Sequence, residues 1–160
     1  SPEPNRCPVG RYLSYMAQLM RIWLKPVKGE PLQEVEHASV RSNHGLVGNA
    51  ERGGPRQVTV LSAEDWEAAN AEADAELDPS ARRANILVTG LGDLVESTGR
   101  VLQVGEARIQ VTGETQPCGL MDAAHQGLRA AMEVGWRGGV HGIALNDADL
   151  AVGDEVSWES

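Results

Sequence analysis

Aromatic residues and positive charge are both scarce in this sequence. Phenylalanine is absent, and the aromatic residues make up 4% of the 160 residues. Lys and Arg number 14 against 23 Asp and Glu, which gives a formal net charge of -9 at pH 7. Binding to the phosphates of nucleic acid needs a cationic face, so the composition argues against DNA or RNA as a principal partner. A local basic pocket for a small anion remains compatible with it.

Long apolar runs and cysteine pairs are also lacking. No segment approaches the roughly 20 apolar residues that span a bilayer, so we expect no membrane partner. The segment 9–24 contains arginines and a glutamine, which makes it a poor signal-peptide core. Two cysteines, Cys7 and Cys118, do not make a disulfide scaffold, although a bond between them stays open. We therefore expect a cytoplasmic protein.

The common metal and nucleotide motifs are missing. The sequence has no CxxC or HExxH pattern, and its histidines are scattered at His37, His44, His125 and His141. It also has neither GxxxxGK[ST] nor GxGxxG. These absences argue against the common zinc sites and the two usual phosphate-binding loops.

Short apolar runs between turns dominate the chain, which contains 18 glycines and 8 prolines. The pattern predicts strands over 22–24, 35–40, 58–61, 86–88, 101–104, 107–112 and 141–145, with a final strand ending at 158. Helices are expected over about 12–20, from Ser62 onward and after Cys118. The predicted fold is α+β and mainly β: a closed β-barrel of short strands with a few packed helices.

The length is sufficient for one domain with a core and short for two. We expect a single domain over 20–160. Residues 1–19 are expected to form an N-terminal extension that is partly helical or flexible.

Cys118 stands between the predicted strand at 107–112 and the helical pattern that follows. Leu120, Ala124, Leu128 and Met132 recur every four residues and predict the buried face of one helix. Unpaired N–H groups and the positive end of a helix dipole favour a thiolate at this position. Our hypothesis is that this sulfur carries the function.

Two other interpretations of Cys118 remain open. It can be an inert buried cysteine, since free cysteine is among the most buried residue types. It can also be the nucleophile of a Cys–His hydrolase with His125 or His141 as the base. A thiolate is, in addition, a soft ligand that suits thiophilic metals.

Two further stretches are candidates for binding an anion. The glycine-rich segment 42–57 contains His44 and Arg56 and could wrap an anion, although a plain surface loop fits as well. Arg82 and Arg83 are adjacent in an acidic chain, which indicates an anionic ligand. Alternatively, both arginines pair with neighbouring carboxylates.

Six short motifs occur in order: GLVGN at 45–49, QVTVLSAEDW at 57–66, RRANI at 82–86, LQVG at 102–105, QPC at 116–118 and VGDEV at 152–156. In this order they resemble the MOSC domain, the C-terminal module of molybdenum-cofactor sulfurases. The resemblance covers roughly 20–158. The RxN motif followed by the PC pair is its specific part.

This resemblance implies a β-barrel of the pyruvate kinase type with helices packed around it. It also implies binding of the molybdenum cofactor (molybdopterin), and it brings an association with pyridoxal phosphate binding. Cys118 would be the molybdenum ligand or the sulfur carrier. The residues that would hold the pterin or its phosphate, or line the same site, are Arg82, Arg83, Asn85, His44 and Arg56.

The resemblance implies two functions of different classes. One is an oxidoreductase that reduces N-hydroxylated compounds, with a small-molecule substrate and an external electron donor. The other is a non-catalytic sulfur or cofactor carrier that works with a sulfurase partner. The chain departs from the usual GL-x-GD loop because Asn49 stands where an aspartate is usual, so a third outcome is that the fold remains without cofactor binding.

Overall fold

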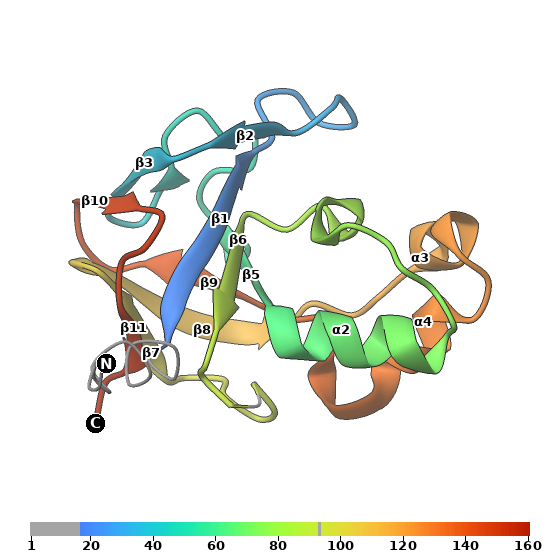
Figure 1. The fold of residues 1–160 in the computed structure, drawn as a ribbon. Coiled ribbons are helices and arrows are strands. Elements are labelled where there is room, and N and C mark those ends of the chain that lie inside the picture. The colour runs from blue at the N-terminus through green and yellow to red at the C-terminus, as the bar shows by residue number, and fades with distance from the viewer. Residues whose placement is uncertain (1–16, 93) are drawn as a thin grey trace, which may run out of the picture.

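The computed structural model describes residues 17–92 and 94–160, and it is built mainly of β-strands (Figure 1). Eight strands form one sheet in the order β11-β7-β8-β9-β5-β6-β1-β2. Their bounds are β1 Gln18–Leu24, β2 Gln33–Val35, β5 Val58–Ser62, β6 Ile86–Thr89, β7 Val101–Val104, β8 Ala107–Glu114, β9 Val140–Ala144 and β11 Val156–Trp158.

A second sheet has three strands in the order β10-β3-β4. These are β3 His37–Arg41, β4 Gly45–Leu46 and β10 Ala148–Ala151. The helices are few and short: α2 Ala63–Glu72, η2 Pro79–Arg82, α3 Gly119–Ala124, α4 Leu128–Glu133 and η3 Val134–Trp136. Figure 1 shows α2, α3 and α4 together at one side of the large sheet, away from the small one.

The large sheet is a half-barrel that is open rather than closed, so the predicted closed barrel is not confirmed. Its edge strands are β2 and β11. One bridge between Gln18 and Glu155 brings the start of β1 beside the segment that leads into β11. Backbone hydrogen bonds of 2.8–3.0 Å flank this bridge, from Leu19 N to the Asp154 carbonyl and from Val156 N to the Ala17 carbonyl among others. A single bridge does not complete a ladder of the kind that closes a barrel.

The core lies in two clusters on opposite faces of the large sheet, because side chains alternate along a strand. Val60 belongs to the cluster inside the half-barrel, together with Ile86 and Ile109. Leu61, the next residue along β5, belongs to the cluster under the helices, with Trp66 and Leu128 among its members.

Several predicted elements are confirmed. Ser62 caps α2 by accepting a hydrogen bond from the Asp65 N–H at 3.2 Å, as the sequence pattern predicts. The predicted hairpin is formed by β7 and β8, which pair antiparallel with Leu102 opposite Ile109. The strand at 58–61 is present as β5, and all five of its residues are buried.

The single helix predicted after Cys118 is wrong. Two six-residue helices, α3 and α4, are found there instead. His125 is extended and Gly127 has a φ of +92°, which a helix cannot accommodate. The chain therefore turns, and Leu120 is 63% exposed rather than buried.

Two smaller predictions also need correction. The strand predicted over 35–40 is interrupted at Glu36, where β2 of the large sheet gives way to β3 of the small one. The helix predicted over 12–20 is wrong at its end, because Leu19 and Met20 lie in β1. Residues 12–16 lie outside the described residues. Within the described ranges, no helix is long and apolar enough to cross a membrane.

Candidate functional site

A small cavity lies where β1, β5, η2 and the end of β8 meet. Its volume is about 50 Å³, which is the space of one or two water molecules. Four cationic residues line it, and no carboxylate is among the lining residues. The cations are Lys25, Arg56, Arg82 and Arg83. In a chain with a net charge of -9, this concentration of positive charge marks a place for an anion.

Arg82 is the most buried of the four cations, with 9% exposure. Its Nε donates to the Gly138 carbonyl at 3.0 Å, and its Nη2 donates to the Thr115 carbonyl at 2.8 Å. Within the described residues it forms no ion pair. Burial lowers the pKa of Arg82, but arginine stays protonated in proteins. A buried cation without a counter-ion is unfavourable, so Arg82 favours binding of an anion.

Gly138 makes the approach of Arg82 possible. A Cβ atom at this position would lie 2.5 Å from the Thr115 carbonyl oxygen and 3.2 Å from Arg82 Nη2. Contacts of 2.5 Å to backbone do not occur, so a side chain here would push the two segments apart. The glycine therefore holds the end of β8 and the arginine together.

Lys25 and Arg83 add charge at the rim of the cavity. Lys25 is half-buried, and burial lowers its pKa; Arg83 and Arg56 lower it further, whereas Glu51 acts in the opposite direction. The Lys25 Nζ lies 3.5 Å from a Glu51 carboxylate oxygen. Arg83 Nη2 donates to the Glu30 carbonyl at 2.7 Å and forms no ion pair with a described residue. Thus neither Arg82 nor Arg83 pairs with a carboxylate of a described residue, which was the alternative interpretation of the two arginines.

Cys118 lies three residues after Thr115 and is exposed. It precedes α3, whose first turn receives no side-chain capping bond. As a thiolate, Cys118 raises the pKa of Arg82, whereas the neighbouring Arg56 lowers it. Cys118 is not itself among the residues that line the cavity, but it follows the lining residue Thr115 closely in the chain. Because Cys118 is exposed, the interpretation of it as a buried cysteine is wrong.

No histidine activates this thiol in the described part of the chain. The His125 Nε2 lies 3.0 Å from the Ala73 carbonyl oxygen. The His141 Nδ1 lies 2.7 Å from Thr112 Oγ1, and burial is the main cause of its lowered pKa. Neither ring forms a hydrogen bond with the Cys118 sulfur, so the Cys–His hydrolase is not assembled.

Asn85 lies beside the cavity, but its side chain is fully used by the protein. The Oδ1 accepts from the Thr59 N–H at 3.0 Å and from Thr59 Oγ1 at 3.1 Å. The Nδ2 donates to the Trp23 carbonyl at 3.1 Å and to Asn49 Oδ1 at 3.2 Å. Asn49 Oδ1 also accepts from the Lys25 N–H at 2.8 Å, so it fixes the strand end that carries the lysine. Both amides act here as supports for the cavity wall.

We expect Asn85→Ala to lower the free energy of unfolding by about 2–4 kcal/mol, because buried donors and acceptors on Thr59 and Trp23 lose their partner. Asn146→Ala is the control: it removes two hydrogen bonds, to Arg108 N and the Glu106 carbonyl, at a more exposed position, and should lose less. Denaturant unfolding measures both. An equal loss in the two variants would contradict the supporting role.

The structure brings some of the residues predicted from the sequence together at this cavity and leaves others apart. Arg56, Arg82 and Arg83 line the cavity, whereas His44 and Asn85 are not among the lining residues. Lys25 and Thr115 also line it, and the sequence pattern does not predict either of them. The available signals were weak: a lone lysine between a predicted strand and Pro26, and a threonine shortly before Cys118.

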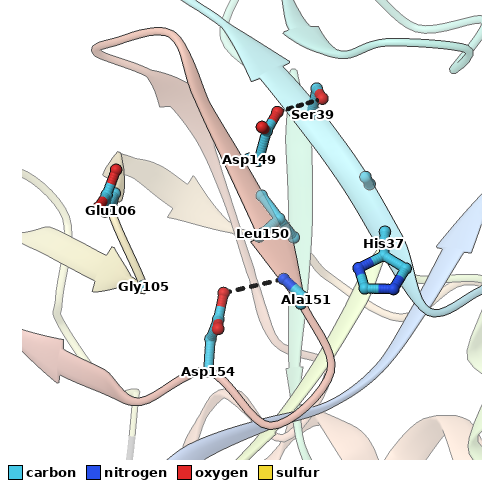
Figure 2. Close-up of a pocket in the computed structure, with 9 residues that line it drawn as sticks. His37, Ser39, Gly105, Glu106, Asp149, Leu150, Ala151 and Asp154 are labelled. Atoms are coloured by element: carbon cyan, nitrogen blue, oxygen red, sulfur yellow. Dashed lines mark hydrogen bonds between the residues drawn. The ribbon is translucent and has the colours of Figure 1, made fainter.

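A larger cavity of about 620 Å³ lies elsewhere, between the small sheet and the turn at Gly105 and Glu106 (Figure 2). Two of its three carboxylates are already engaged: Asp149 accepts from Ser39 Oγ at 2.5 Å, and Asp154 accepts from the Ala151 N–H at 2.8 Å. The third belongs to Glu106, and no lysine or arginine lines the cavity. None of the residues predicted from the sequence lines it. We therefore place the candidate site at the smaller, cationic cavity.

The donor groups at this cavity fit one kind of metal group and exclude another. Among the described residues, no cluster of three or more His, Cys, Asp or Glu could hold a metal ion. Cys118 alone can supply only one soft ligand. A metal whose other ligands come from an anionic organic cofactor needs only one ligand from the protein. Cys118 can supply that ligand, and the four cations can bind the anionic part of the cofactor.

Comparison with known proteins gives the family. The family model described as "MOSC domain" matches residues 34–157, which is more than half of the chain. No protein with curated annotation matches the sequence.

Solved structures of low sequence identity share the fold. The YuaD protein from Bacillus subtilis has a TM-score of 0.72 and 18% identity, covering 88% of this chain and 94% of that chain. YiiM from Geobacillus stearothermophilus has a TM-score of 0.69 and 17% identity, with 90% and 75% covered. YiiM from Escherichia coli has a TM-score of 0.65 and 17% identity, with 89% and 70% covered. The family match confirms the resemblance found in the sequence, and the chain belongs to the MOSC domain family.

Proposed function

We propose that this protein binds the molybdenum cofactor and reduces N-hydroxylated compounds, with Cys118 as the molybdenum ligand. The MOSC family is associated with molybdenum-cofactor binding. The observation that carries the proposal is the buried, positively charged Arg82, which has no counter-ion among the described residues. It donates to the carbonyl of Thr115, three residues before the exposed Cys118.

The residues of the chain divide the binding task. Arg82, Arg83, Lys25 and Arg56 provide positive charge for the anionic part of the cofactor, where the planar fork of arginine matches phosphate oxygens. Cys118 provides one soft ligand from the segment between β8 and α3. The volume of about 50 Å³ admits only a small anionic group, so this cavity would hold that group alone and not the whole cofactor.

When bound, the cofactor would supply a redox-active metal centre for a two-electron reduction of the substrate. An N-hydroxylated base takes up two electrons and two protons and releases water. The electrons come from an external donor. The exposed position of Cys118 supports access for a small substrate.

The same exposure favours a second candidate function. A cysteine that is open to solvent can hand a sulfur atom or a bound cofactor to another protein, such as a sulfurase partner or a recipient enzyme. In that role the protein binds its cargo and catalyses nothing.

One assay separates the two functions. Protein from a host that makes the cofactor is mixed with a reduced viologen dye and an N-hydroxylated base, and oxidation of the dye is followed. We expect oxidation that depends on both the base and the bound molybdenum. Bound molybdenum without turnover would contradict the reductase and favour the carrier.

A further inference from the structure

Thr115 has a buried hydroxyl that finds no hydrogen-bond partner in the part of the chain that the structure describes. The residue directly follows β8 and is 9% exposed. Its N–H donates to the Gly139 carbonyl at 2.9 Å, and its carbonyl accepts from Arg82 at 2.8 Å. The Oγ1 alone has no partner among residues 17–92 and 94–160. Buried hydroxyl groups are nearly always hydrogen-bonded, so this one indicates a group that belongs in the cavity that Thr115 lines.

The guanidinium of Arg82 is only partly used as well. Its Nε and Nη2 each donate to a backbone carbonyl, and these two atoms form one side edge of the planar group. A guanidinium has five N–H donors. The edge formed by Nη1 and the second N–H of Nη2 makes no hydrogen bond within the described residues. That edge has the spacing that binds two oxygens of one phosphate.

We propose that Thr115 Oγ1 and the free edge of Arg82 form a subsite for a tetrahedral oxyanion such as a phosphate monoester. Arg82 supplies two charge-assisted hydrogen bonds, and the threonine supplies a neutral donor. Lys25 and Arg56 supply further positive charge at the same cavity. Thr115 is thus a ligand-binding residue. The identity of the whole ligand rests on the proposed function. The inference that the subsite binds an oxyanion depends only on the contacts of Thr115 and Arg82.

Inorganic phosphate is the probe that isolates this subsite. Calorimetric titration of the full chain, at constant ionic strength kept with chloride, measures its affinity. We expect Thr115→Val to weaken phosphate binding about tenfold or more, because a hydrogen bond to a charged group is lost. Thr115→Ser keeps the hydroxyl and should stay within about threefold of the unchanged protein. Equal affinity of Thr115→Val and the unchanged protein would overturn the proposal and would mean that only water meets the hydroxyl.

Thermal unfolding without phosphate gives a second readout. Thr115→Val removes an unsatisfied polar group, so its Tm should rise by about 2–4 °C. Thr59→Val is the matched control, since that buried hydroxyl accepts from the Asn85 N–H at 2.8 Å and its loss should lower the Tm. Saturating phosphate should then raise the Tm of the unchanged protein more than that of Thr115→Val. A lower Tm for Thr115→Val without phosphate would overturn the proposal, because the hydroxyl would already have a partner.

Failure of this inference and failure of the proposed function give different results. Phosphate binding that depends on Thr115, in a protein that never takes up molybdenum, would contradict the proposed function and support the subsite. The opposite result is that Thr115→Val and the unchanged protein retain equal molybdenum and bind phosphate with equal affinity. That result would overturn the subsite and leave the proposed function standing.

Discussion

Replacement of Arg82 by methionine is expected to weaken binding of inorganic phosphate about a hundredfold or more. Arg82 is the buried cation of the cavity, and two charge-assisted hydrogen bonds of about 1.5–3 kcal/mol each would be lost with it. The substitution also leaves the carbonyls of Thr115 and Gly138 without their donor, so we expect lower stability. Calorimetry on the folded fraction separates the two effects.

Two further variants keep this prediction testable. Arg82→Lys retains the charge without the planar fork, and we expect binding between that of the unchanged protein and that of Arg82→Met. Arg129→Met is the matched control, since Arg129 lies on the surface and its side chain forms a weak ion pair of 3.9 Å with Glu133. If Arg82→Met and Arg129→Met bind phosphate equally well, Arg82 is a purely structural arginine.

Cys118→Ser is expected to reduce the molybdenum content of the purified protein almost to background while leaving the fold intact. The cysteine is exposed and forms no side-chain capping bond, so the folded chain loses little when sulfur becomes oxygen. A serine hydroxyl is a much poorer ligand for a thiophilic metal than a thiolate. Metal analysis gives the molybdenum-to-protein ratio, and thermal unfolding gives the state of the fold.

The other cysteine provides the control for this experiment. Cys7 lies outside the described residues, and Cys7→Ser should retain molybdenum at the level of the unchanged protein. Full molybdenum content in Cys118→Ser would remove the ligand assignment. Equal loss in both variants would point to a general effect of thiol removal.

Elements with a local cause could be predicted from the sequence. The cap at Ser62 and the hairpin of β7 and β8 depend on residues within a few positions of each other. Val60 and Leu61 are consecutive apolar residues that face opposite sides of a strand, which predicts that both faces of β5 are covered. They do not reveal which strands pair with β5. The mainly β class followed from these patterns.

Other features depend on contacts between distant segments. The strand β10 was not predicted, because it is defined by pairing with β3 more than a hundred residues earlier. The break in the helix after Cys118 rests on His125 and Gly127, and the four-residue apolar period concealed it. Whether the sheet closes is likewise set by pairing at its edges, which no local pattern specifies.

The same division applies to the site. Arg82, Arg83 and Cys118 could be selected because their residue types suit an anion and a soft metal. Lys25 and Thr115 could not, because their role arises only when the ends of β1 and β8 meet beside η2. Asn85 was selected from a motif, and its four hydrogen bonds within the protein show a supporting part that the motif alone does not state.

We propose above that the cationic cavity and Cys118 bind the molybdenum cofactor together. The most direct test incubates the purified full chain with released cofactor, removes the excess, and measures molybdenum and pterin per protein. We predict close to one of each per chain for the unchanged protein, and background values for a variant that carries both Arg82→Met and Cys118→Ser. Equal molybdenum and pterin in the two proteins would contradict the claim.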